Sequence, residues 1–192
     1  QLFNDFSPTR VAPTEFENYK SNLNLNRGFS EKLQIYQKTI PLLTKAALKT
    51  IQVSLMSMVV AVLGGLLLVT ARLYGGALLK TFAVFFIEVI RGTPLLLQLF
   101  FIFYALPSLG IEFSPLWAAV LGLGINYSVQ ECEIYRSGLL SVHKNQIEAA
   151  KLLGLTSWQS FWSVQAPQAF RISLPPMTTD FIALIKDSSL VS

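Results

Sequence analysis

The sequence predicts an all-α integral membrane protein, because three long windows of the chain carry no charged residue. These windows are residues 50–71, 92–111 and 113–130. About 20 apolar residues are enough to cross the hydrocarbon core of a bilayer as a helix. One such window would fit the core helix of a soluble protein, but three in a chain of 192 residues favour membrane spans. The composition agrees: 52% of the residues are hydrophobic and only 14% are charged, against about a quarter charged in soluble domains.

The composition also argues against a nucleic-acid partner, an internal disulfide and a metal cluster. The net charge of +4 is spread along the chain without a basic stripe, so we expect no nucleic-acid partner. Cys132 is the single cysteine and His143 the single histidine, which excludes an internal disulfide and leaves no metal cluster to propose. In a membrane protein, the basic residues instead report orientation.

The first 50 residues are more polar than the rest. Residues 1–30 are rich in Asn and contain two prolines, which indicates a polar tail or linker. Residues 31–48 have apolar positions three or four apart and interspersed lysines, which predicts an amphipathic helix on the membrane surface. Pro41 is expected to interrupt or kink this helix.

The apolar stretches define four expected spans, of which the second is broken by the run from Arg91 to Pro94. The spans cover about residues 50–72, 78–106, 116–135 and 175–192. Because basic residues gather on the cytoplasmic side, loop 72–80 and region 136–171 are expected in the cytoplasm and loop 107–115 outside. The parity of the spans then places the N-terminal tail outside, although it is basic.

A compact helical knob is expected in the polar stretch 143–167. Asn145 can cap a helix, with Glu148 three positions later completing a capping box. Gly154 is a natural C-terminal break. Ala149 and Ala150 offer a small-residue face that another surface can approach closely.

A second short helix is expected to follow. Thr156 and Gln159 have the spacing of another capping box, and Pro167 is expected to close the helix. Such a knob at a membrane surface has a shape that allows it to bind another protein. Local signals also fit a plainer interpretation, in which Glu148 is only a cap.

A family resemblance favours the first interpretation. The pattern resembles the EAA loop of ABC importer permeases, and runs Glu148-Ala149-Ala150, three residues, Gly154, nine residues, Val164, one residue, Ala166-Pro167. Ala166 departs from the usual Leu. Four further stretches resemble the polar amino acid permeases of the histidine, glutamine and arginine type: 86–101, Asn126-Tyr127, 133–136 and 186–192. The resemblance covers about residues 35–192.

The resemblance implies a MetI-like helical bundle with five spans in the full protein, about four of them here and the fifth beyond Ser192. It implies that the EAA loop couples to a separate ATPase subunit, through Glu148, Ala149, Ala150, Gly154 and Leu155. ATP and Mg would then bind to that partner, with no cofactor on this chain. The chain itself has no phosphate-binding Gly-x-x-x-x-Gly-Lys-Ser/Thr run, so we expect a transport subunit and not an enzyme.

The resemblance also implies the surroundings of the chain. These are the bacterial cytoplasmic (inner) membrane and its lipid, crossed several times, and a second permease subunit, identical or different. A solute-binding protein, or such a domain fused upstream of Gln1, would deliver the amino acid.

Charged and polar residues inside the expected spans are candidates for the substrate pathway. Asp180, beside Thr179, is our hypothesis for the contact with the amino or cationic group of the substrate; the alternative is a packing pair with Lys or Arg. Asp187, seven residues on, shares its helix face. Gln98 either meets substrate or bonds a neighbouring helix.

Other charges have the spacing of structural pairs. Glu88 and Arg91 are three apart and can pair on one helix face. Glu131, Glu133 and Arg136 can pair with one another or form a gate.

Two alternative functions remain at this stage. A secondary transporter usually has internal repeats, and no second copy is visible. A membrane enzyme would need a cluster of nucleophile, base or metal ligands, and no such motif appears.

Overall fold

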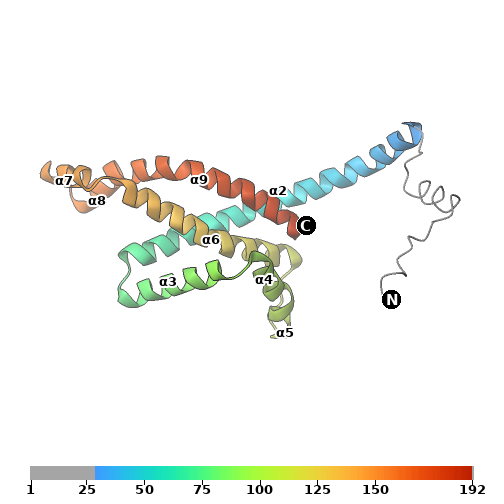
Figure 1. Ribbon diagram of the computed structural model, residues 1–192, viewed down its shortest axis with the longest axis horizontal. Coiled ribbons are helices and arrows are strands. Elements are labelled where there is room, and N and C mark those ends of the chain that lie inside the picture. The colour runs from blue at the N-terminus through green and yellow to red at the C-terminus, as the bar shows by residue number, and fades with distance from the viewer. Residues whose placement is uncertain (1–28, 192) are drawn as a thin grey trace, which may run out of the picture. The chain divides into compact units, whose positions relative to one another are not determined.

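The computed structural model describes residues 29–191, and the chain divides into two units, 1–46 and 47–192 (Figure 1). The predicted polar tail lies almost wholly outside the described residues. Helix α2 (Phe29–Tyr74) begins in the first unit and continues into the second as one helix of 46 residues. The predicted interruption at Pro41 is therefore wrong, whereas the kink and the position of residues 31–48 on the membrane surface stay predictions. Pro41 is exposed, so water can satisfy the carbonyl that its ring leaves without a donor.

The predicted second span is a bent pair of helical segments. Helix α3 (Ala77–Gly92) meets the segment that begins with α4 (Leu95–Phe100) at an angle of 103°. Thr93 has φ −111° and ψ 135° because a residue before proline avoids the helical region. The break thus falls within the predicted run.

The bent segment continues through a π-helical turn, η1 (Phe101–Ala105), into α5 (Leu106–Ser108). The backbone N–H of Leu106 bonds to the carbonyl of Phe101, five residues back. This shift in hydrogen bonding lets the helix accept Pro107, which has no N–H to donate.

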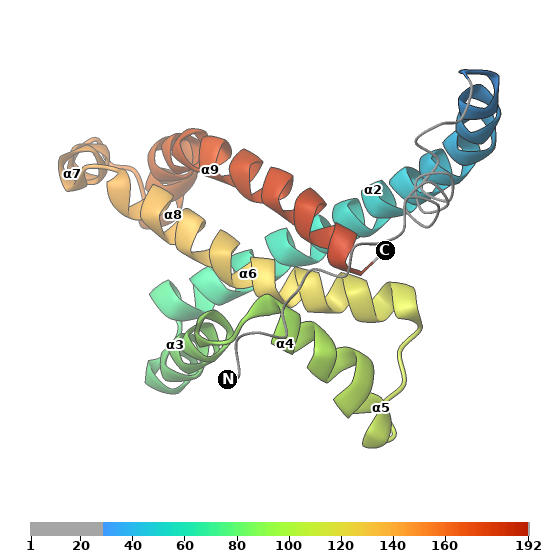
Figure 2. The ribbon, with the colours of Figure 1, turned by 45° about the vertical axis from the view of Figure 1, so that its right-hand side comes forward.

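Helix α6 (Pro115–Ser141) is central to the second unit and runs beside α9 (Ala166–Asp187), which ends in the 3-10 turn η3 (Ser188–Leu190) (Figures 1 and 2). Close approach depends on glycine. A Cβ on Gly138 would lie 2.3 Å from the Ser173 hydroxyl oxygen and 2.9 Å from the Ala169 carbonyl oxygen. A Cβ on Gly65 of α2 would lie 2.7 Å from the Cβ of Glu131. Helix α6 therefore touches α2 and α9 almost backbone to backbone.

The core forms along the same helix. Three clusters of buried residues each join α6 to its neighbours: Val53 with Ala119, Val120 and Leu123; Val69 with Ile87, Val129 and Cys132; Ala61 with Tyr127 and Leu184. Helices α2, α3 and α9 thus all pack against one central helix.

The stretch predicted as a knob contains α7 (Lys144–Leu152), α8 (Ser157–Ser160) and the π-helical turn η2 (Phe161–Gln165), which leads directly into α9. Two predictions here are wrong. His143, not Asn145, is the N-cap of α7, and it makes no side-chain cap bond. Pro167 does not close the second helix but lies in the first turn of α9, where its missing N–H costs least.

By length and hydropathy, the Thr39–Tyr74 part of α2 is the one helix of residues 29–191 able to cross a membrane by itself. The bent pair Ala77–Gly92 and Leu95–Ser108 adds a second if it is taken as one broken span. Helices α6 and α9 are long enough but fall short of the same combination of high hydropathy and few charges. The expected total of about four spans therefore stays a prediction.

Candidate functional site

The first candidate site is the coupling knob, which we define as α7, α8 and the turn between them, residues 144–160. It lies at one end of the α6–α9 pair (Figure 1). Gly154 has φ +85°, a left-handed conformation that side chains disfavour, and nothing lies within 4 Å of the position of its Cβ. The predicted break at Gly154 is confirmed. The predicted capping box of Thr156 and Gln159 is also confirmed, with both reciprocal bonds present.

The turn presents apolar side chains to solvent. Leu152 is 90% exposed and Leu153 is 82% exposed. Trp158, on α8, is 70% exposed and lies edge-on to Trp162 at a centroid distance of 5.5 Å. Exposed apolar surface of this kind marks a site that meets another protein or the membrane.

The predicted coupling residues divide between the surface and the interior of the knob. Glu148, Ala149 and Gly154 are exposed, whereas Ala150 is buried and Leu155 is half-buried. The N–H of Leu155 donates to the carbonyl of Ala150 at 3.2 Å and closes the turn. The small-residue face thus consists of Ala149 alone, while Ala150 packs inside.

The second candidate site is a cavity of about 360 Å³ between α3, α6 and α9, which we call the polar pocket. Its lining is Arg91, Gln130, Glu133, Ile134, Pro176, Thr179 and Asp180. Two of the four predicted pathway residues, Thr179 and Asp180, therefore come together here. The Oδ2 atom of Asp180 is buried and has no hydrogen-bond partner within residues 29–191. No ion pair to Asp180 forms in that part of the chain either, so the predicted packing pair is not observed.

Glu133 is the best-partnered charge beside this pocket. Its carboxylate accepts hydrogen bonds from Arg72 of α2 and, at 2.8 Å, from Nε of Arg136. Arg91 lies farther off, with an N–O distance of 3.8 Å to the same carboxylate. The predicted Glu133–Arg136 pair is confirmed. Arg91 reaches Glu133 across helices, so the predicted pair with Glu88 is wrong.

Glu131 behaves differently from Glu133, two positions away. It is fully buried, and the polar group that interacts with its carboxylate is the Tyr135 hydroxyl, although the two make no hydrogen bond of standard geometry in the described part of the chain. Because two positions on a helix face nearly opposite directions, Glu131 points away from the arginines that surround Glu133. Its predicted part in a pair with Arg136 is wrong.

The other two predicted pathway residues join helices. Gln98 donates through Nε2 to the Ile90 carbonyl at 2.8 Å and to the Thr93 hydroxyl at 2.6 Å, and its Oε1 accepts from Asn126 of α6 at 3.1 Å. Gln98 thus ties the α3–α4 break to the central helix. Asp187 accepts from the Tyr127 hydroxyl at 2.8 Å. These are the interhelical bonds expected for polar residues in a bundle, and contact of either residue with substrate stays a prediction.

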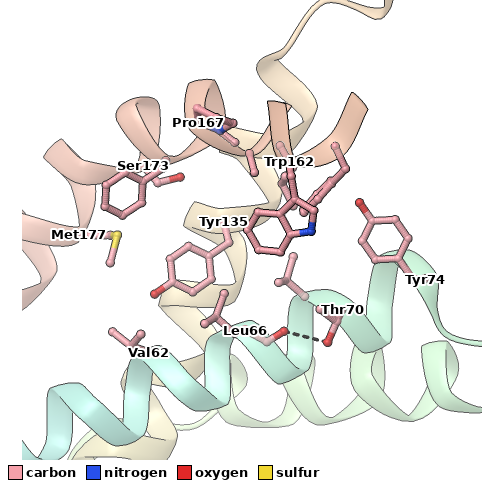
Figure 3. A pocket seen from close by; sticks show the side chains of 15 residues that line it. Val62, Leu66, Thr70, Tyr74, Tyr135, Trp162, Pro167, Ser173 and Met177 are labelled. Atoms are coloured by element: carbon pink, nitrogen blue, oxygen red, sulfur yellow. Dashed lines mark hydrogen bonds between the residues drawn. The ribbon is translucent and has the colours of Figure 1, made fainter. Parts of the chain in front are cut away.

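A larger cavity of about 500 Å³ lies between α2, α6, η2 and α9 (Figure 3). Its labelled side chains include Val62 and Leu66 of α2 on one side and Met177 of α9 on the other, with Tyr135 and Trp162 between them. It offers no charged group, so it suits a polar amino acid poorly.

Sequence reasoning did not place Arg91, Gln130 and Glu133 at the same cavity as Asp180. The sequence contains an indirect indication for Arg91, because this residue stands at the break in the second apolar stretch. At such a break, both the free backbone groups and the charge need polar partners. Their meeting depends on the contacts of three separate helices.

The broken second span and the glycine-mediated helix contacts fit a helical membrane protein. The family model described as "Binding-protein-dependent transport system inner membrane component" matches residues 61–192, and the chain belongs to this family. The family therefore disfavours both the secondary transporter and the membrane enzyme, because its members are components of transport systems fed by a binding protein.

Particular relatives narrow the comparison. The chain is 39% identical over 164 residues to the probable amino-acid ABC transporter permease protein YckA of Bacillus subtilis, covering 85% of this chain and 72% of YckA. It is 40% identical to the glutamine transport system permease protein GlnP of Escherichia coli K12, covering 79% and 70%. A solved amino acid ABC transporter with histidines matches with a TM-score of 0.78 and 33% identity, covering 86% of this chain and 76% of that chain. The predicted resemblance to amino acid ABC permeases is confirmed.

Proposed function

We propose that this chain is the permease subunit of an importer of polar amino acids in the bacterial cytoplasmic membrane, which it crosses several times. A separate ATPase, with its own ATP and Mg, would dock on the coupling knob. A second permease subunit would complete the path, and a solute-binding protein or fused domain would deliver substrate. The observation that carries the proposal is the knob itself: a glycine turn that holds Leu152 and Leu153 out into solvent.

The connection from the knob to the polar pocket supports a mechanical role. From Ser157 to Asp187 the segments α8, η2 and α9 follow one another without an intervening loop. Thr179 and Asp180 lie in α9, the last part of this continuous helical segment. A movement of the knob by the ATPase would therefore shift the pocket wall directly, because packed helices switch between discrete arrangements rather than deform.

The pocket and the relatives support the proposed substrate class. Asp180 offers a carboxylate with an unpartnered oxygen to an amino or cationic group, and Thr179 lies beside it. One relative is named as a glutamine permease, and the side chain of glutamine is an uncharged polar amide.

The test is capture of candidate ATPase subunits by the full-length permease in detergent, comparing wild type with Gly154→Asp. A side chain at φ +85° strains the turn by about 1 kcal/mol and adds a charge among the exposed leucines. We expect the variant to lose the ATPase and keep its fold.

Gly76→Asp is the matched control. Gly76 also has nothing within 4 Å of its Cβ position, but its φ is −62° and it is the N-cap of α3, where Asp is favourable. Capture that survives Gly154→Asp, or no capture by wild type, would contradict the proposed coupling.

A further inference from the structure

We propose that Arg91 and Asp180 form a two-point site in the polar pocket, in which Arg91 binds the α-carboxylate and Asp180 the α-ammonium group of one free amino acid. Arg91 would then be a specificity-determining residue that rejects amines without a carboxylate. The inference rests on the proposed import function and adds to it the group that reads the carboxylate.

Arg91 is the cation of the pocket that is still available. Glu133 already accepts hydrogen bonds from Arg72 and Arg136, while Arg91 stays 3.8 Å away and its side chain is 57% exposed. Its guanidinium therefore retains most of its donors for another acceptor. A planar guanidinium binds a carboxylate through two parallel hydrogen bonds, which makes it the natural reader of that group.

Asp180 supplies the opposite charge from a different helix. Its Oδ2 atom is buried without a partner in the described part of the chain, an arrangement that costs free energy unless a donor arrives. Within residues 29–191 the ion pairs all involve Glu133, and none joins Arg91 to Asp180. A ligand with both charges would satisfy both residues at once.

The dimensions and the remaining lining fit a small zwitterion. The cavity of about 360 Å³ lies within the range of small-molecule sites. Gln130 and Thr179 add uncharged polar groups for a side chain, while Ile134 and Pro176 close the wall. Since Glu133 is neutralised by its arginines, one positive and one negative group remain, which matches a net-neutral α-amino acid and not a simple cation.

The experiment measures ligand binding to the full-length permease assembled with its ATPase in nanodiscs. The twenty free amino acids are screened by calorimetry, and the tightest is compared with the amine that lacks its carboxylate, for example L-arginine with agmatine. Wild type should bind the amino acid at least about tenfold more tightly than the amine, the effect of a charged hydrogen bond. Arg91→Gln should weaken the amino acid to the level of the amine and leave the amine unchanged.

Three further variants complete the design. Arg91→Lys keeps the charge but loses the planar fork, so it should weaken the amino acid to a smaller extent and also serve if Arg91→Gln fails to fold. Asp180→Asn should weaken the amino acid and the amine alike, because both carry the ammonium group. Arg171→Gln, which removes an exposed cation on α9 outside the pocket, should change neither affinity.

Equal losses for amino acid and amine in Arg91→Gln, or no loss for either, would overturn the site. So would a wild type that captures and drives its ATPase yet binds none of the twenty amino acids, a result that leaves the proposed coupling intact. A wild type that binds amino acid through Arg91 but captures no ATPase would instead contradict the proposed function and retain the site.

Discussion

The coupling knob and the polar pocket depart from ordinary protein chemistry in opposite ways. At the knob, large apolar side chains stand in solvent, with Leu152 at 90% and Leu153 at 82% exposure. At the pocket, the Oδ2 atom of Asp180 is buried without a hydrogen-bond partner in residues 29–191, and Glu131 is buried elsewhere on α6. The leucines of the knob lack cover, and the buried carboxylate oxygen of the pocket lacks a hydrogen-bond donor.

The difference indicates what each region is built to meet. Exposed leucines are covered best by an apolar groove on another protein, and the burial is favourable in proportion to its area. Buried carboxylates are satisfied by a donor or a cation, and without one they destabilise the fold. A protein surface therefore fits the knob, and a small charged ligand fits the pocket.

The largest expected effect is on the knob side of this comparison. Leu153→Asp should reduce ATPase capture by about a hundredfold or more, because a charge would be buried at the centre of the contact. The same change should leave the melting temperature of the permease unaltered, since Leu153 is 82% exposed. Capture in detergent and thermal unfolding of the same samples measure the two effects.

Leu109→Asp is the matched control for that variant. Leu109 is 70% exposed and lies in the loop expected on the outer side of the membrane. Equal loss of capture in both variants would show that the effect is not specific to the knob.

The second prediction concerns a polar residue that has all its partners. Gln98→Leu removes the bonds to Ile90 and Thr93 across the α3–α4 break and leaves the Asn126 amide without its acceptor. We expect a loss of about 1–2 kcal/mol in the free energy of unfolding, the range for interhelical polar contacts in membranes. It would be measured as a lower melting temperature in detergent.

If Gln98→Leu is as stable as wild type, the hydrogen bonds of Gln98 do not stabilise the fold. Amino acid binding measured on the same variant addresses the open prediction that Gln98 also meets substrate. Asn126→Leu removes the same hydrogen bond from the other side. If Gln98→Leu loses affinity and Asn126→Leu does not, direct contact between Gln98 and the substrate is favoured.

Local chemistry made some elements readable from the sequence. The helix end at Gly154 was predictable because glycine ends helices in the left-handed conformation. The capping box of Thr156 and Gln159 was predictable because it involves residues only three positions apart. The break before Pro94 follows from the same kind of short-range constraint.

The prolines and the charges were harder to read. Pro41 and Pro167 both lie within helical chain, since an exposed carbonyl in one case and a first-turn position in the other remove most of the cost. The partner of Arg91 lies 42 positions away on another helix. Spacing along one helix favoured Glu88, and only the packing of α3 against α6 shows that Glu133 is nearer.

The smallest expected effect tests the other buried carboxyl, Glu131 of α6, and should have the opposite sign to the effect of Gln98→Leu. Glu131→Met replaces a fully buried carboxyl, which interacts with the Tyr135 hydroxyl but makes no hydrogen bond of standard geometry, by an unbranched apolar side chain of similar length. Removing such a group should raise the free energy of unfolding by about 1 kcal/mol, and hence the melting temperature. Glu88→Met, an exposed change on α3, should leave it unaltered. A lower melting temperature for Glu131→Met would mean that the carboxyl is satisfied in the assembled protein, so that its burial is evidence of a partner and not of an unpaired charge.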